Sequence, residues 1–362
     1  MAPTPNHNCV RSLNNNLTLN HTGGGQPVLP SPPFIDAPGL ANLRDVGGYE
    51  IAGPSHRPPH QMVRRGRLYR SADPSGLTAE GVTVLSDQLG IKTVFDLRSV
   101  VELSRDGTPP TPSWDGSTRV SVPIFLDKDY SPEALAVRFN NYSDGLEGFV
   151  RAYSSILAAA ADPGHPHAPF RTIFESLAST PPSPLLVHCT AGKDRTGIFC
   201  ALVLALCGVD DEAIAHDYSL TDLGLAQLKE ATVQKLINGD ALRGDRARAE
   251  RMVSSRKENM LATLATLRAT YGSVETYVTA HCGVPAAAVE QVRRNLIVDI
   301  DTNHHQQQQQ QQPTDWRAQA LALERAGTAT GATTSPSPSS PGIFAARQVQ
   351  AAVQAHVVAT AV

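Results

Sequence analysis

The chain is poor in cysteine, with five among 362 residues, and it carries no marked excess of charge, since 31 Lys and Arg stand against 34 Asp and Glu. Such a sparse, odd set of cysteines argues against a disulfide framework and favours a reducing compartment. A net charge of −3 provides no basic field for nucleic acid. No run approaches the roughly 18 apolar residues that cross a bilayer, so we expect no transmembrane segment.

The first 40 residues also lack a basic start and an apolar core segment, so they do not resemble a secretory signal. We expect a cytoplasmic protein, with access to the nucleus left open, and the sequence indicates no oligomeric state. The composition predicts three parts: a disordered N-terminal tail over residues 1–33, one folded domain over residues 34–300, and a disordered tail over residues 301–362. The last part holds a polyglutamine tract and a stretch rich in Ala, Ser and Pro. Within it, residues 343–362 are compatible with a short helix.

The most informative segment, residues 188–197, reads His-Cys-Thr-Ala-Gly-Lys-Asp-Arg-Thr-Gly. Five small or polar residues separate Cys189 from Arg195, and apolar runs stand on both sides of the segment. This pattern predicts a buried strand, a tight loop and a buried helix. The N–H groups of such a loop and of the first helical turn converge on one point, where they favour an anion and a thiolate at Cys189. Arg195 adds a planar fork that matches two phosphate oxygens.

Two other interpretations fit parts of this segment. A lone cysteine before an apolar helix is usually a small core residue, but here the other motif residues are in register with it. The nucleotide-binding phosphate loop has the pattern G-x-x-x-x-G-K-[ST]. Val187 stands where its first glycine belongs, and Asp194 replaces its magnesium-binding hydroxyl. The segment therefore predicts a nucleophile below a phosphate cradle, which is the minimum needed to transfer a phosphoryl group to sulfur.

Short apolar runs alternate with segments of helical periodicity along the body of the chain. The predicted strands are 67–70, 92–97, 119–125 and 185–188; the predicted helices are 146–161, 170–178, 196–207, 211–218, 225–237, 256–269, 273–280 and 286–297. Gly208 is a suitable C-cap after the third helix. The alternation predicts an α/β fold, a central, mostly parallel sheet flanked by helices, with a helical C-terminal third. Ligands of such sheets bind at the carboxyl ends of strands, where Cys189 lies.

Residues 188–197 resemble the signature of the cysteine-dependent protein and lipid phosphatases. The A-G-K-D-R-T-G form is similar to the atypical group called tyrosine phosphatase family 3, which includes bacterial tyrosine and phosphoinositide phosphatases and fungal relatives. Other motifs of that group are matched by residues 41–49 (its N-x-R-D-x-G-G box), 68–71, 93–99 with Glu102, 216–220 and 271–277. The resemblance covers residues 34–300. It implies a cysteine phosphatase-like fold and hydrolysis of phosphate monoesters through a phosphocysteine, with no metal or cofactor.

Each step of this chemistry has candidate residues. Cys189 attacks phosphorus, while Arg195 and the loop N–H groups hold the equatorial oxygens. His188 orients the loop and favours the thiolate, or it is a core histidine bonded to backbone; both are compatible. Thr196 donates a hydrogen bond to the thiolate and also acts as a helix N-cap. The predicted phosphate-binding residues are Thr190, Ala191, Gly192, Lys193, Asp194 and Arg195.

The proton donor to the leaving group has two possible locations. Relatives outside this group use an aspartate in a W-P-D loop, and no such tripeptide occurs here. The family resemblance favours Asp194, inside the phosphate loop. Asp127 or Asp129 follows the predicted strand that ends at Phe125, the chain position where other phosphatases carry a movable acid loop, although a solvated surface loop explains this pair as well. We place Asp194 first.

For the substrate, the sequence permits phosphotyrosine, a phosphoinositide, or phosphoserine and phosphothreonine, in that order, so dual specificity is possible. Lys193 matches the second lysine in the loop of phosphoinositide phosphatases, where its ammonium would meet a second phosphate, but Thr190 replaces their first lysine, and a solvent-facing Lys193 is equally compatible. Residues 225–255 stand where some relatives carry a helical lid, which would exclude water and protect the thiolate. Polar residues of the remaining motifs are expected mainly to hold the loop, with Arg44 or Arg98 as a possible substrate contact; they are Asn42, Arg44, Asp45, Arg70, Asp96 and Arg98.

Three other functional classes compete with a phosphatase. A catalytically inactive phosphate-binding relative is disfavoured because Cys189, Arg195 and Thr196 are all present. A sulfur-transfer or arsenate-reducing enzyme needs a different loop length or a nearby resolving cysteine, and Cys200 lies about one helical turn too deep for that role. A scaffold built on the polyglutamine tract explains less of the chain.

Overall fold

The computed structural model describes residues 29–51, 61–105, 112–239, 242–300 and 315–329. Within this part the strands are β1 (Arg44–Asp45), β2 (Gln61–Val63), β3 (Leu68–Ser71), β4 (Thr93–Asp96), β5 (Thr118–Ser121), β6 (Leu185–His188) and β7 (Ile297–Asp299). The helices are α1 (Ala79–Thr83), α2 (Val100–Arg105), α3 (Pro132–Ser143), α4 (Gly145–Ala160), α5 (Pro169–Leu177), α6 (Asp194–Leu206), α7 (Asp211–Ser219), α8 (Thr221–Gly224), α9 (Ala226–Asn238), α10 (Arg246–Val253), α11 (Lys257–Tyr271), α12 (Val274–Thr276), α13 (Ala286–Leu296) and α14 (Trp316–Ala329). Short 3-10 and π turns complete the description: η1 (Pro74–Gly76), η2 (Val84–Gln88), η3 (Asp127–Tyr130) and η5 (Tyr277–His281).

The central sheet has the strand order β1-β3-β6-β4-β5 among the described residues. Strands β3, β6, β4 and β5 pair in parallel, and β1 joins the edge of β3 antiparallel. All residues of β6 are buried, as expected for a central parallel strand covered on both faces. The predicted α/β fold with a mostly parallel sheet is confirmed.

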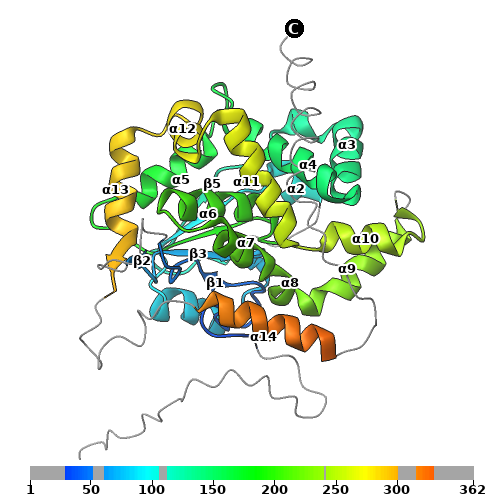
Figure 1. Cartoon of the computed structure of the whole chain (residues 1–362), viewed down its shortest axis with the longest axis horizontal. Coiled ribbons are helices and arrows are strands. Elements are labelled where there is room, and N and C mark those ends of the chain that lie inside the picture. Colours follow the sequence, from blue (N-terminus) through cyan, green and yellow to red (C-terminus); the bar gives the residue numbers. More distant parts are fainter. Residues whose placement is uncertain (1–28, 52–60, 106–111, 240–241, 301–314, 330–362) are drawn as a thin grey trace, which may run out of the picture.

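Alternation along the strands builds a core on each face of this sheet. Leu185 and Val187 of β6 pack into the larger core, which also takes side chains from α4, α5, α6, α7 and α11. Leu186, which points the opposite way, packs into a smaller core with Leu85 of η2 and Val94 of β4. This period of two follows from strand geometry. Figure 1 shows α5, α6, α7 and α11 together on one side of the sheet.

Helix α6 runs through the middle of the larger core. Its residues are apolar on all sides and nearly all of them are buried, as the sequence predicts for a helix surrounded by other elements. The helix ends before Gly208, whose φ of +89° is the left-handed conformation expected after a helix C-terminus. The strand and helix that flank the loop at residues 189–193 are therefore both fixed by burial.

Most predicted strands and helices agree with the structure to within two residues, but the strand predicted over 119–125 and the tail predicted over 301–362 differ by more. The strand expected over 119–125 stops at Ser121, because β5 pairs with β4 and β4 ends at Asp96. The tail expected over 301–362 contains α14, which packs against α7: the Trp316 ring lies 5.6 Å from the His216 ring, and Gln319 donates to the Pro32 carbonyl at 3.0 Å. Residues 343–362 lie outside the described part.

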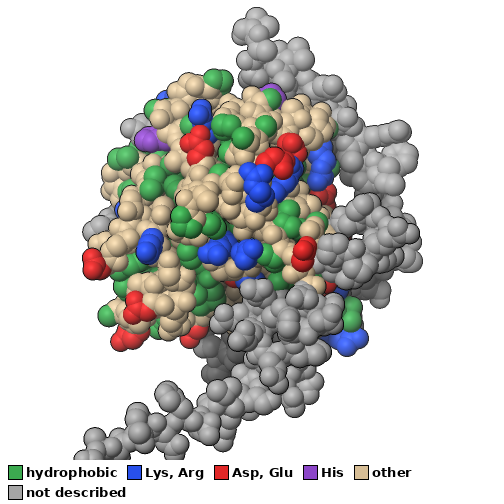
Figure 2. Space-filling view, turned by 90° about the vertical axis from the view of Figure 1, so that its left-hand side faces the viewer, with side chains coloured by type: hydrophobic (Ala, Val, Ile, Leu, Met, Phe, Trp, Pro, Cys, Tyr) green, Lys and Arg blue, Asp and Glu red, His purple; other side chains and the backbone are tan. Residues whose placement is uncertain are grey.

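No helix in the described ranges is both long and apolar enough to cross a bilayer. On the face shown in Figure 2, Lys and Arg side chains are interspersed with Asp and Glu.

Candidate active site

The loop between β6 and α6 lies at the carboxyl end of the central strand. Gly192 has a φ of +63°, and a Cβ there would lie 2.1 Å from the Ser71 carbonyl oxygen, so only glycine fits. Helix α6 begins at Asp194, and no side chain caps its first turn. Within the described structure, the backbone N–H groups of residues 190–193 donate no hydrogen bond. An uncapped helix start and free loop amides together favour a bound anion.

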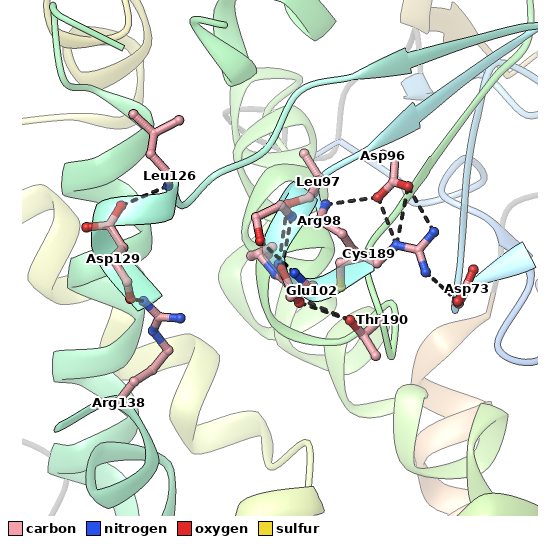
Figure 3. Close-up of polar contacts among 12 residues, drawn as sticks. Asp73, Asp96, Leu97, Arg98, Glu102, Leu126, Asp129, Arg138, Cys189 and Thr190 are labelled. Atoms are coloured by element: carbon pink, nitrogen blue, oxygen red, sulfur yellow. Dashed lines mark hydrogen bonds and ion pairs between the residues drawn. The ribbon is translucent and has the colours of Figure 1, made fainter. Parts of the chain in front are cut away.

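Cys189 occupies the base of this loop. Its exposed fraction is 2%, and it follows His188 directly, at the point where β6 ends. The neighbouring Thr190 is exposed. Figure 3 shows Cys189 beside the contact between Thr190 and Glu102, so a buried thiol lies next to an exposed residue of the loop.

Arg195 is held in a forked ion pair beside the loop. Its Nη1 lies 2.6 Å from Glu102 Oε2 and its Nη2 lies 2.8 Å from Glu102 Oε1. Nη1 also reaches the Leu97 carbonyl at 3.3 Å, and Nη2 reaches Thr190 Oγ1 at 3.4 Å. Glu102 comes from α2. The sequence places it in a family motif with residues 93–99 but predicts no role for it. The pair fixes the plane of the guanidinium at the rim of the loop.

Asp194 contacts two neighbours through one carboxylate oxygen. The Tyr153 hydroxyl donates to Asp194 Oδ1 at 2.7 Å and lies 2.6 Å from the Tyr218 hydroxyl. The Lys193 ammonium is 3.5 Å from the same Oδ1. Burial, followed by the charge of Asp194, raises the pKa of Tyr153 well above its ordinary value, so this hydroxyl remains a donor. Nothing in the sequence distinguishes Tyr153 from the other buried residues of α4.

Lys193 points away from solvent and into the protein. It is 5% exposed, and its Nζ donates to the carbonyls of Met252 at 2.7 Å and Ser254 at 3.3 Å. The ammonium also lies 5.2 Å from the centre of the Phe149 ring. The solvent-facing alternative for Lys193 is therefore wrong, and the ammonium is engaged by the C-terminal end of α10.

Residues 225–255, predicted as a lid by position, form the helical pair α9 and α10. Val233 of α9 and Ala249 of α10 share a small core with Phe139 of α3, separate from the two sheet cores. Arg248 donates to Ser143 Oγ at 2.7 Å. This pair is thus attached to the body through α3 and through the phosphate loop.

A buried ion network supports the loop from behind. The Asp217 carboxylate accepts from Arg44 Nε at 3.0 Å and from Arg70 Nη1 at 2.5 Å. Arg70 Nη2 then donates to the Gly192 carbonyl at 2.8 Å, and Asn42 Nδ2 donates to the Ala191 carbonyl at 3.1 Å. Both arginines are fully buried, so the suggested substrate contact of Arg44 is wrong. Burial alone would raise the pKa of Asp217, but the two guanidiniums outweigh it and lower the pKa.

Asp45 and Arg98 stabilise neighbouring turns. Asp45 accepts from the N–H groups of Gly47 at 2.8 Å and Gly66 at 2.7 Å. Arg98 pairs with Asp96 at 2.9 Å and also with Asp73, as Figure 3 shows. The expectation that these polar residues mainly hold the structure together agrees with both arrangements.

His188 and Thr196 are buried at the end of β6 and in the first turn of α6. His188 Nδ1 lies 3.2 Å from the Cys189 carbonyl, and its Nε2 lies 3.6 Å from Asp96 Oδ2. Burial lowers the pKa of His188 despite the opposing charge of Asp96. Thr196 is the third residue of α6, so its predicted N-cap role is wrong; its hydroxyl is buried and has no hydrogen-bond partner in the described structure.

The alternative acids lie on η3. The Asp129 carboxylate accepts from the Leu126 N–H at 2.8 Å and thereby caps its own turn. Figure 3 shows Asp129, with Leu126 and Arg138, in a group apart from Cys189. The side chain of Asp127 lies outside the described part of the structure. Of the acidic residues proposed from the sequence, Asp194 is the one within the phosphate loop.

Comparison with known proteins agrees with this geometry. The sequence profile described as "Tyrosine phosphatase family" matches residues 35–298. The chain belongs to this family. It is a protein-tyrosine phosphatase, and the family expected from the sequence is confirmed. A similar protein is the "Triple specificity protein phosphatase PtpB" of Mycobacterium tuberculosis, 29% identical over 72% of this chain and 98% of the relative. Another is a "Tyrosine-protein phosphatase" of Nostoc commune, 33% identical over 37% of this chain and 46% of the relative.

Proposed function

We propose that this phosphatase hydrolyses phosphate monoesters through a phosphocysteine at Cys189, within a catalytic domain over residues 34–300. In the first step the thiolate attacks phosphorus, a sulfur–phosphorus bond forms, and the bond from phosphorus to the leaving oxygen breaks. The leaving oxygen takes the electron pair and a proton from Asp194. In the second step water attacks phosphorus, Asp194 accepts its proton, and the thiolate leaves. The observation that supports this proposal is the loop itself, where Cys189 is followed by amides that donate no hydrogen bond within the described structure and by the Arg195 fork, which Glu102 holds.

Charge stabilisation falls to the loop and to Arg195. The three outer phosphate oxygens carry most of the charge, and preorganised N–H donors at fixed positions stabilise that charge without reorganising. Glu102 holds the Arg195 guanidinium in place at the rim through two hydrogen bonds. The buried Thr196 hydroxyl, which has no partner among the described residues, is a suitable donor to the sulfur when it leaves. His188 orients the loop through its contact with the Cys189 carbonyl.

Phosphotyrosine is the first proposed substrate, phosphoinositides stand second, and phosphoserine and phosphothreonine stand third. The family description and the relative from Nostoc commune both carry the word tyrosine, and the name of the relative from Mycobacterium tuberculosis includes triple specificity. Phosphoinositide hydrolysis stays the second choice, because the Lys193 ammonium that would meet a second phosphate is bonded to two carbonyls of residues 252–254.

A panel of phosphotyrosine peptides, phosphoserine peptides and phosphoinositides tests the substrate order, with Cys189→Ser assayed in parallel to tie each activity to this site. Asp194→Asn tests the acid. It should lower kcat for alkyl phosphates more than for aryl phosphates, because an alkoxide needs protonation more than a phenoxide does. Equal losses on the two substrates, or no loss, would remove Asp194 from this role, and activity retained in Cys189→Ser would contradict the phosphocysteine.

A further inference from the structure

Two tyrosine side chains form a line of hydrogen bonds that ends at the proposed acid, Asp194. Tyr153, from α4, donates to Asp194 Oδ1 at 2.7 Å, and the hydroxyls of Tyr153 and Tyr218 lie 2.6 Å apart. The rings of the two tyrosines meet edge to face, with centroids 6.2 Å apart. Both tyrosines are essentially buried. Their hydroxyls therefore depend on hydrogen-bond partners within the protein, because a buried hydroxyl without a partner is costly. The Asn259 side chain also interacts with the Tyr218 hydroxyl.

The line has a fixed direction of donation. An ionised carboxylate can only accept hydrogen bonds, so the Tyr153 proton points at Asp194. The Tyr153 oxygen is then left to accept from Tyr218. Burial raises the pKa of both phenols, and the charge of Asp194 adds to this, so neither loses its proton at working pH. Tyr218 thus donates to Tyr153, and Tyr153 donates to Asp194.

This direction distinguishes the two oxygens of Asp194. Oδ1 accepts from Tyr153 and lies 3.5 Å from the Lys193 ammonium. Oδ2 receives no hydrogen bond from the residues that the structure describes. A proton taken up by Asp194 therefore sits on Oδ2, since placing it on Oδ1 would set it against the Tyr153 proton.

We propose that Tyr153 is a positioning residue for the acid: supported by Tyr218, it holds Asp194 Oδ1 and keeps the transferable proton on Oδ2. The inference rests on the proposed role of Asp194. Other groups that face Asp194 are Lys193 of the loop and Tyr142 of α3. The Tyr142 ring meets the Tyr153 ring edge to face at 6.3 Å, but Tyr142 makes no hydrogen bond to Asp194 among the described contacts.

The test compares Tyr153→Phe with Tyr142→Phe, which removes a hydroxyl from the same aromatic cluster. In Tyr153→Phe, kcat for an alkyl phosphate should fall about tenfold, while kcat for an aryl phosphate stays unchanged. The basic limb of the kcat profile should also move up by about one pH unit, because a hydrogen bond that favours ionised Asp194 is lost. Tyr218→Phe should shift both quantities less and in the same direction, and Tyr142→Phe should leave them as in the wild type.

The outcomes separate this inference from the proposed function. If Asp194→Asn shows the leaving-group dependence but Tyr153→Phe changes neither the dependence nor the pH profile, the positioning role is overturned and the acid role stands. Equal losses on alkyl and aryl substrates in Tyr153→Phe would indicate disturbed packing and would also overturn it. If Asp194→Asn shows no leaving-group dependence, the acid role fails and the positioning role fails with it. Should Tyr153→Phe not fold, the Tyr218→Phe profile decides, and an unchanged profile there counts against the inference.

Discussion

Replacing Asp217 by Asn tests whether the buried ion network organises the phosphate loop. In the native protein two guanidiniums share one carboxylate, Arg44 at 3.0 Å and Arg70 at 2.5 Å, and all three side chains are at most 2% exposed. The amide of Asn has nearly the same shape but no charge. It leaves two cations in the interior without a counterion, and breaking a buried pair in this way costs about 3–5 kcal/mol.

The assay is urea unfolding at neutral pH, with Asp211→Asn as the matched control. Asp211 also pairs with an arginine in a fork, at 2.5 and 2.7 Å from Arg268, but these side chains are 35% and 40% exposed. Solvent screens such a pair, so its loss should cost about 1 kcal/mol or less. Both variants remove one carboxylate charge that pairs with arginine, so the difference between them measures the effect of burial together with that of the second guanidinium beside Asp217.

A second readout follows the loop itself. Arg70 holds the Gly192 carbonyl at 2.8 Å, so a displaced Arg70 should weaken inhibition by vanadate, an anion that occupies a phosphate site, by about tenfold. Asp211→Asn should leave vanadate inhibition unchanged. Equal stability losses in the two variants, or a destabilised Asp217→Asn with normal vanadate inhibition, would refute the link between the network and the loop.

Two more predictions concern the loop glycine and the pH dependence of stability. Gly192→Ala should abolish most activity and lower the free energy of unfolding by at least about 1 kcal/mol, because the φ of Gly192 is +63° and a Cβ there would lie 2.1 Å from the Ser71 oxygen. Gly244→Ala is the control, since Gly244 has a similar φ of +76° but open space around it. Similar activity in the two variants would contradict the role of the clash. Burial, followed by Lys257, lowers the pKa of His216 from 6.5 to about 4. The unfolded chain therefore binds a proton more readily, and the free energy of unfolding should fall as the pH drops from 6.5 to about 4. His216→Gln should reduce this fall by roughly 3 kcal/mol. The free energy of unfolding is measured with urea at several pH values, and a dependence on pH that is the same in the variant and the wild type would show that His216 is not buried in its neutral form.

Much of the architecture could be predicted from local patterns. The apolar run of β6 and the all-round apolar α6 place Cys189 between them, because burial of each element depends on its own residue types. The alternation of Leu185, Leu186 and Val187 between two cores also follows from strand geometry. The family could be predicted from residues 188–197 because the few residues that form the phosphate loop are adjacent in sequence.

Local patterns failed where a helix depends on its partner. The composition that follows the polyglutamine tract predicts a tail, but Trp316–Ala329 forms α14 against His216 and Pro32. A helix of this length is marginal alone in water, and most of its stability comes from packing. The direction of Lys193 was open for a related reason, since the carbonyls that bind it belong to residues 252–254.

The sequence by itself determined the phosphate loop, its strand and helix, and the family, because these depend on neighbouring residues and on burial of short apolar runs. Only the tertiary structure decided what surrounds the loop. Tyr153 is 41 positions from Asp194, and Arg44 is 173 positions from Asp217. Such contacts arise when helices pack around a sheet. The sequence near a buried tyrosine or arginine does not indicate which distant side chain will be its hydrogen-bond partner.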